Sequence, residues 1–147
     1  MDDPNHARNG WLAFALGSAV FAAATALLGK VAVGEINSNL ATLIRTVVIL
    51  VLVTGVVAAR GEWQPLGDVS RRAVLMLLLS GAATGLSWLC YYRALQLAPA
   101  SQVAPIDKLS VAITIVVGVL VLGEPVTWRM AVGGGLIVAG ALVLAWG

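Results

Sequence analysis

The stretch that decides the fold runs from Ala98 to Glu124 and reads APASQVAPIDKLSVAITIVVGVLVLGE. Residues 111–122 are dominated by Val, Ile and Leu, which favours a helix that crosses a lipid bilayer. Asp107 and Lys108 lie inside the same segment, roughly 10 Å along a helix axis from its start near Ser101. A charged side chain inside a bilayer costs at least ~2.5 kcal/mol and usually marks a transport pathway or a paired site. The pair therefore predicts a polar environment inside a membrane protein.

The composition of the whole chain supports a membrane protein. Of its 147 residues, 60% are hydrophobic and 11% are charged, whereas soluble domains carry roughly 25% charged residues. The net charge of +2 comes from nine basic and seven acidic residues, which are too scattered to form a nucleic-acid surface. Cys90 is the single cysteine, so no disulfide framework, metal site or cofactor is expected.

Long apolar segments predict an all-α membrane protein. Residues 1–10 form an expected polar N-terminal tail, and residues 11–147 form one expected transmembrane domain. The first apolar run is longer than the ~7–15-residue core of a cleavable signal peptide, so it is interpreted as a retained helix. Five transmembrane helices are expected, over residues 11–33, 40–59, 73–96, 101–122 and 127–146.

Three further basic residues, Lys30, Arg45 and Arg93, lie within or at the ends of these apolar segments. Lys30 follows a line of small residues in the first segment, and it either snorkels to the membrane surface or contacts a substrate. Arg45 lies well inside the second segment and keeps its charge in any protein environment. It must therefore reach the membrane interface or find an acceptor, and Thr42, Thr46 and Asn39 are expected in the same polar mouth.

Asp107 is expected to pair with a base on another helix. Successive residues on a helix point about 100° apart, so Lys108 is not the favoured partner of Asp107. Counting membrane crossings places Lys30, Arg45 and Arg93 on the same side of the membrane as Asp107. Each of these three bases is a candidate partner.

An aromatic cluster precedes Arg93 at the end of the third segment. Trp88 is three residues before Tyr91 and four before Tyr92, so it can share a helix face with either tyrosine. The cluster is interpreted either as a packed aromatic layer reaching the lipid headgroups or as the wall of a ligand cavity.

Strips of small residues predict close helix contacts. The first segment carries Ser18, Ala22, Thr25 and Gly29, and the third carries Gly81 and Gly85. The last segment has small residues at four-residue intervals, Ala131, Gly135 and Ala139, and a Gly133-Gly134-Gly135 run, which together are interpreted as a helix contact strip.

The order of motifs in the second half resembles the EamA domain of the drug/metabolite transporter superfamily. The resemblance rests on Tyr92-x-Ala94-Leu95, then Pro99-Ala100-Ser101, an apolar helix, Gly123-Glu124 and a Gly-rich last helix with Gly140. Most members carry two such domains in inverted orientation. This chain has one, so it resembles the small five-helix bacterial and archaeal branch.

The chain departs from the usual pattern of that family. Asp107-Lys108 replaces a usually apolar stretch, and Val111 stands where many members have proline. The first helix also lacks the central acidic residue that the small multidrug resistance branch uses for proton coupling.

The resemblance implies a transporter in the bacterial or archaeal cytoplasmic membrane. An inverted-repeat site requires two copies, so an antiparallel homodimer with dual topology is expected. Four bases and one acid favour an amino-acid-like or other anionic metabolite, and Asp107 is the candidate for proton coupling. The expected substrate contacts are Lys30, Arg45, Trp88, Tyr91, Tyr92, Arg93, Asp107 and Lys108.

Two other interpretations remain open at this point. The charges could instead fix helix register in a structural membrane subunit or in one half of a heteromeric transporter, and a channel is a weaker possibility. No catalytic constellation is visible, so an enzyme is not expected.

Overall fold

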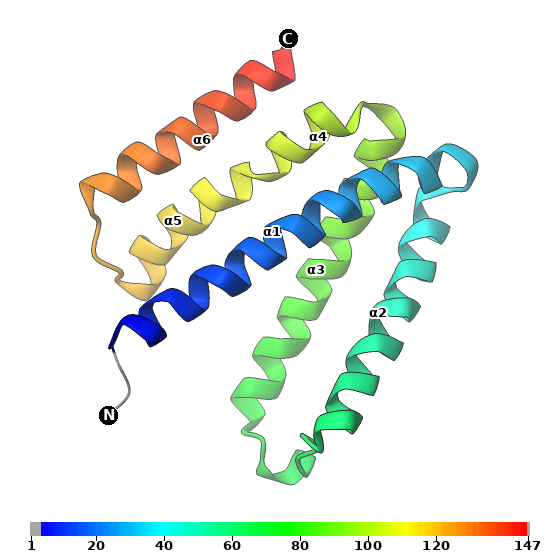
Figure 1. Cartoon of the computed structure of the whole chain (residues 1–147), viewed down its shortest axis with the longest axis vertical. Coiled ribbons are helices and arrows are strands. Elements are labelled where there is room, and N and C mark those ends of the chain that lie inside the picture. The colour runs from blue at the N-terminus through cyan, green and yellow to red at the C-terminus, as the bar shows by residue number, and fades with distance from the viewer. Residues whose placement is uncertain (1–3, 147) are drawn as a thin grey trace. The chain divides into compact units, whose positions relative to one another are not determined.

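The structure of the chain, a computed structural model, describes residues 4–146, and all secondary structure elements in that range are helices (Figure 1). Five helical segments are long and apolar enough to cross a membrane, which confirms the predicted number of spans. The helices are α1 (Pro4–Glu35), α2 (Ser38–Arg60), η1 (Leu66–Asp68), α3 (Arg71–Leu97), α4 (Ala100–Asp107), α5 (Leu109–Leu122) and α6 (Trp128–Trp146).

Helix α1 begins at Pro4, inside the stretch expected to be a polar tail. Residues 1–3 of that expected tail lie outside the described residues. The buried residues of α1 are Ala26, Gly29 and Val33. Of the small-residue strip expected on this helix, Gly29 is buried whereas Ser18 and Ala22 are exposed. Among residues 10–35, burial on α1 is therefore confined to the C-terminal part of the helix, where Gly29 of the strip lies.

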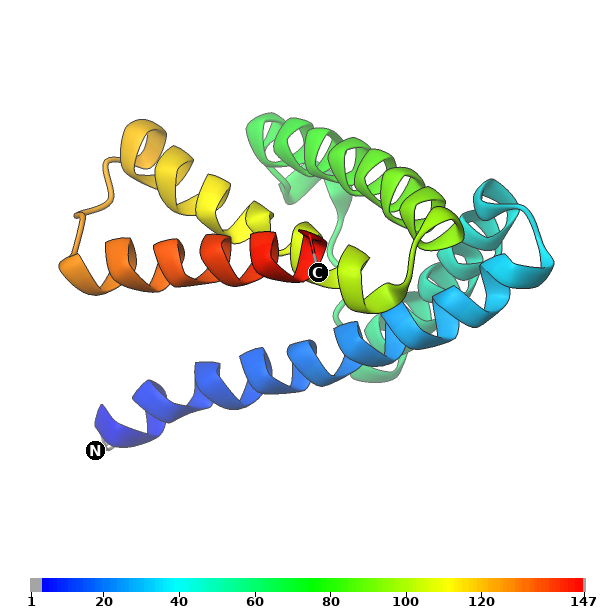
Figure 2. The same ribbon diagram turned by 90° about the horizontal axis from the view of Figure 1, so that it is seen from above.

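The chain divides into two compact units, which we describe separately. The first unit contains the chain up to Val31 and from Pro99 onward, and the second unit is Ala32–Ala98. The second unit is built on a helical hairpin in which α2 and α3 pack side by side (Figures 1 and 2). Gly61 ends α2 in a left-handed conformation at φ 65°, which glycine adopts without the steric penalty of a side chain.

In the first unit, the expected fourth span is two helices and not one. Helix α4 ends at Asp107 and α5 begins at Leu109. Pro105 lacks the amide hydrogen that would bond to the carbonyl one turn earlier, which weakens the helix at this point. The Lys108 amide donates to the Pro105 carbonyl at 3.0 Å, a tighter turn than an α-helix makes.

Helix α6 packs against both α4 and α5 (Figure 2). Its buried residues are Gly134 and Ala141, whereas the predicted contact strip of Ala131, Gly135 and Ala139 is exposed. A methyl group added to Gly134 would lie 3.3 Å from Ile115 Cδ1 of α5. The Gly133-Gly134-Gly135 run of the predicted strip is thus buried at Gly134, and a helix contact at Ala131, Gly135 and Ala139 stays a prediction.

Large apolar side chains cover the outside of the described helices, as a lipid-facing surface requires. The tryptophans near helix ends, Trp11, Trp63, Trp128 and Trp146, are also exposed. Tryptophan is enriched where membrane meets water, so these four residues fit an interfacial belt.

Candidate functional site

Arg45 of α2 lies against two aromatic rings of α3. Its guanidinium carbon is 3.6 Å from the centroid of the Trp88 ring and 5.2 Å from that of Tyr92. Trp88 and Tyr92 are one helical turn apart and therefore share a face of α3. Both distances are within the ~6 Å range of a cation–π interaction. The structure thus brings together three of the residues that the sequence singled out.

Within the second unit, no described carboxylate forms an ion pair with this guanidinium. Arg45 is half-buried and lies within the apolar span Ser38–Arg60. Aromatic faces attract a cation, but they do not neutralise its charge. Arg45 therefore remains a net positive charge inside a membrane span.

The two tyrosines have different environments. Tyr92 is 4% exposed, whereas Tyr91 is half-buried. Their ring centroids are 6.3 Å apart and the planes are tilted by 57°, a geometry within the usual range for aromatic pairs. Tyr92 contributes to the packed interior of the second unit, and Tyr91 continues the aromatic surface beside it.

The threonines near Arg45 use their hydroxyls within their own helix. Thr42 Oγ1 donates to the Ser38 carbonyl at 2.9 Å, and Thr46 Oγ1 donates to the Thr42 carbonyl at 2.8 Å. The sequence predicted that both threonines belong to a polar mouth around Arg45. Their hydroxyl hydrogens are used within the helix, because a carbonyl of the preceding turn is a readily available acceptor for threonine, and the polar mouth stays a prediction.

Arg93 lies one turn beyond Leu89 on α3 and is held by a glutamine. Its Nη1 donates to Gln96 Oε1 at 2.7 Å. Gln96 Nε2 in turn approaches the carbonyls of Val33 and Ile36 at 3.4 and 3.5 Å. Gln96 thus connects Arg93 to the turn between α1 and α2, and the sequence reasoning missed it because one glutamine near a helix end carries no distinctive pattern.

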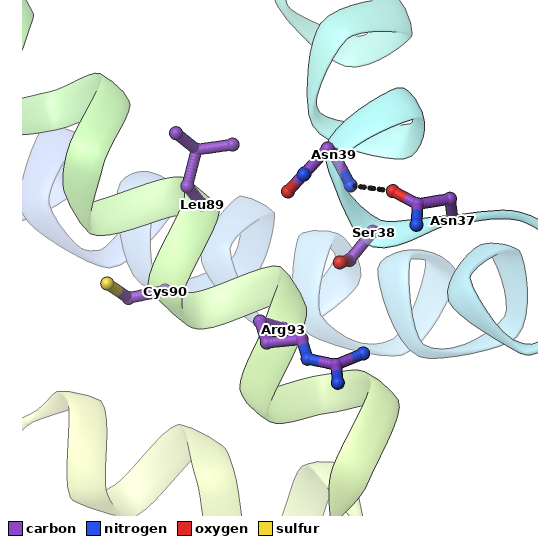
Figure 3. Close-up of a pocket in the computed structure, with 6 residues that line it drawn as sticks. All are labelled: Asn37, Ser38, Asn39, Leu89, Cys90 and Arg93. Atoms are coloured by element: carbon purple, nitrogen blue, oxygen red, sulfur yellow. Dashed lines mark hydrogen bonds between the residues drawn. The ribbon is translucent and has the colours of Figure 1, made fainter.

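A pocket of about 550 Å³ opens between the start of α2 and the last turns of α3 (Figure 3). Asn37 Oδ1 caps α2 by accepting from the Asn39 amide at 2.8 Å. The figure shows the Arg93 guanidinium extending from α3 toward the start of α2. The lining residues are Asn37, Ser38, Asn39, Leu89, Cys90 and Arg93.

Asp107 and Lys108 form an ion pair with each other in the first unit. Lys108 Nζ lies 3.2 Å from Asp107 Oδ2, and both side chains are partly exposed. The prediction that Lys108 is not the favoured partner of Asp107 was therefore wrong. The 100° rule assumes a continuous helix, whereas the helix is interrupted here and a flexible lysine can fold back.

Lys30 also belongs to the first unit, where it is half-buried beside Gly29 on α1. The predicted site residues consequently fall into two groups. The first unit holds Lys30, Asp107 and Lys108, and the second unit holds Arg45, Trp88, Tyr91, Tyr92 and Arg93. Each group is polar or aromatic within an otherwise apolar helical surface.

Comparison with known proteins identifies the kind of protein that carries these groups. Residues 9–146 match the EamA-like transporter family. A relative from Sinorhizobium sp., described as an uncharacterized transporter in the cobO 3′ region, is 53% identical over 135 residues. The match spans 92% of this chain and 96% of the relative. No solved structure matches the chain. This multi-pass membrane protein belongs to the EamA-like transporter family.

Proposed function

We propose that the protein is a secondary active transporter of a small polar metabolite bearing a carboxylate or another anionic group, such as an amino acid. It would act in the cytoplasmic membrane of a bacterium or archaeon. The observation that carries the proposal is the Arg45 guanidinium, which lies on Trp88 inside a membrane span and forms no ion pair with a described carboxylate.

An unneutralised cation inside a membrane span favours an anionic ligand. Charged groups in membranes usually pair with one another or line an aqueous pathway. A guanidinium that lies over an aromatic face has its N–H donors in its own plane, where they can bind a carboxylate with two parallel hydrogen bonds. The Trp88 ring would thus orient Arg45 and leave its donors available to a substrate.

Asp107 is the proposed proton-coupling residue. Its carboxylate is paired with Lys108 at the interruption between α4 and α5, and interrupted helices often hold coupling sites in transporters. Protonation would neutralise the carboxylate and release the lysine. The proposed substrate contacts comprise both groups of residues: Lys30, Arg45, Trp88, Tyr91, Tyr92, Arg93, Asp107 and Lys108.

The proposed assembly is an antiparallel homodimer in which the chain inserts in both orientations. Inverted repeats are a recurrent way to build a transporter, and two oppositely oriented copies would reproduce that arrangement. Labelling a C-terminal cysteine in a Cys90→Ala background from each side of the membrane tests this proposal. Reaction from both sides is expected, and reaction from one side alone would rule out dual topology.

Flux in proteoliposomes that contain this chain alone tests the transporter proposal. Pooled amino acids and small organic acids are offered to the wild type, to Arg45→Ala and to Arg129→Ala, which changes an exposed arginine beside Trp128. Uptake by the wild type and Arg129→Ala, with loss in Arg45→Ala, supports the proposal. Equal uptake by all three proteins would remove Arg45 from the mechanism.

A structural membrane subunit, or half of a heteromeric transporter, is the second candidate function. The Asp107–Lys108 pair favours it, since the two charges satisfy each other locally and need no ligand. In that case Asp107→Asn combined with Lys108→Gln would lower folding yield or assembly, and no compound in the pool would be taken up by any variant.

A further inference from the structure

We propose that the pocket between the start of α2 and the end of α3 binds the carboxylate of a small α-amino or α-hydroxy acid through Arg93, with Ser38 and Asn39 contacting the polar substituent. This inference rests on the proposed transport function and deepens it by naming a substrate class and a second binding position apart from Arg45. All of its residues lie in the second unit.

The first observation is the charge of Arg93. Its bond to Gln96 is a bond to a neutral amide, and no described carboxylate forms an ion pair with it. Glu35, which precedes Asn37 by two residues, is not its partner. Among the described residues, the guanidinium makes one hydrogen bond, so donors remain for a carboxylate.

The second observation is the hydroxyl of Ser38. Ser38 is 2% exposed, yet its side-chain oxygen has no hydrogen bond within the described part of the chain. It is not sealed in the interior either, because no fully buried side-chain oxygen lacks a partner among the described residues. Since Ser38 lines the pocket, the pocket is where this hydroxyl can find one (Figure 3).

The third observation is the way the pocket is held. Gln96 bonds to Arg93 and approaches the carbonyls of Val33 and Ile36, so the arginine is tied to the turn that leads into α2. Asn37 caps α2 and fixes the backbone on the opposite side. Gln96 is therefore a positioning residue, whereas Arg93 is the proposed ligand contact.

Size and lining define the ligand class. A volume of about 550 Å³ is within the range of small-molecule sites. Arg93 suits a carboxylate, Ser38 and Asn39 can donate to or accept from an amine or hydroxyl, and Leu89 offers a short apolar wall. Together they fit a short acid with one polar substituent beside the carboxylate.

Protection of an introduced thiol from alkylation tests this inference without requiring transport. A thiol is introduced as Leu89→Cys, because the Cys90 sulfur points away from the two asparagines and would not report on the pocket (Figure 3). Cys90 is replaced by alanine so that it does not react with the maleimide. The protein in nanodiscs of zwitterionic lipid is treated with a maleimide in the presence of L-alanine, L-lactate or L-malate, or of their methyl esters. An acid at ten times its dissociation constant should slow labelling about tenfold, since the bound fraction is shielded.

Variants assign the protection to Arg93. Arg93→Gln should abolish it, Arg93→Lys should retain part of it, and Arg129→Gln should leave it intact. Unchanged labelling without ligand shows that each variant is folded. Equal protection in Arg93→Gln, or no protection by any of the acids, would overturn the inference.

Changing the lipid composition distinguishes two sources of an anionic group in the pocket, a phospholipid headgroup and a free small acid. Slower labelling caused by anionic phospholipid, with no effect of the acids, would make the pocket a headgroup site and would also overturn the inference. Protection by acids without flux would retain the pocket and reject the transporter. Flux without protection would retain the transporter and reject this pocket as the carboxylate site.

Discussion

The guanidinium carbon of Arg45 lies 3.6 Å from the centroid of the Trp88 ring, inside a membrane span and without an ion pair to a described carboxylate. The contact restricts the orientation of the guanidinium while leaving its charge uncompensated. Its consequences can be tested by changing the stacking and the charge separately.

Arg45→Lys keeps the positive charge but removes the planar group that stacks on Trp88. Losing a partly desolvated cation–π contact costs ~1–2 kcal/mol, so we predict transport reduced about 5- to 30-fold. Trp88→Leu should produce a similar loss. Initial uptake rates in proteoliposomes measure both effects, with Trp63→Leu, a loop tryptophan, as the control. A wild-type rate in Arg45→Lys would show that charge alone is sufficient.

Asp107→Asn removes the group that would bind and release the coupled proton. We predict that transport persists only as exchange or downhill flux and no longer depends on the pH gradient. Asp68→Asn in η1 removes an acidic residue of the polar connection and serves as the control. Flux measured at several internal and external pH values decides the matter, and an unchanged gradient dependence in Asp107→Asn would exclude Asp107 from coupling.

Gly134→Leu should destabilise the packing of α6 against α5. The added side chain meets Ile115 Cδ1 at 3.3 Å, whereas the adjacent Gly135 has open space around it. Overpacking costs typically ~1–3 kcal/mol, which corresponds to a melting temperature lower by about 2–12 °C.

Gly135→Leu is the matched control for that change. The two variants gain the same helix propensity, so their difference in thermal unfolding in detergent isolates the packing effect. Equal melting temperatures would contradict the α5–α6 contact. A loss of crosslinked dimer in Gly135→Leu alone would point to the exposed face of α6 as a subunit contact.

Pro105→Ala should strengthen the helix at the interruption after Asp107. The substitution restores an amide donor and removes a ring that opposes helix geometry, a difference of about 3 kcal/mol in a helix interior. We predict slower amide hydrogen exchange around Lys108 and a reduced transport rate if the interruption takes part in the cycle. Exchange that stays as fast as in the wild type would show that Lys108, and not Pro105, determines the break.

The sequence was sufficient for the helical spans because hydropathy over about 20 residues reports directly on bilayer crossing. It also identified Arg45, Trp88 and Tyr92, which the structure brings together, since charge and aromatic clusters are rare inside apolar segments. Residue patterns describe single segments well, so these features could be predicted from the sequence.

Contacts between segments were harder to predict from the sequence. The sequence did not decide which face of α6 packs within the chain, because glycine and alanine occur on more than one face of that helix. The pairing of Asp107 with Lys108 depended on the helix interruption that follows Pro105. The positioning role of Gln96 depends on contacts with backbone carbonyls, and the pocket beside Ser38 is formed where helix ends meet. No sequence motif indicates either feature.

Concentrative uptake by the purified chain is the measurement that tests secondary active transport most directly. Proteoliposomes containing only this protein receive a labelled substrate from the pooled screen under an imposed pH gradient. We predict accumulation above the external concentration and its collapse when a protonophore is added. Uptake that stops at equal concentrations would indicate a passive pathway, and no uptake of any pooled compound would contradict a self-sufficient transporter.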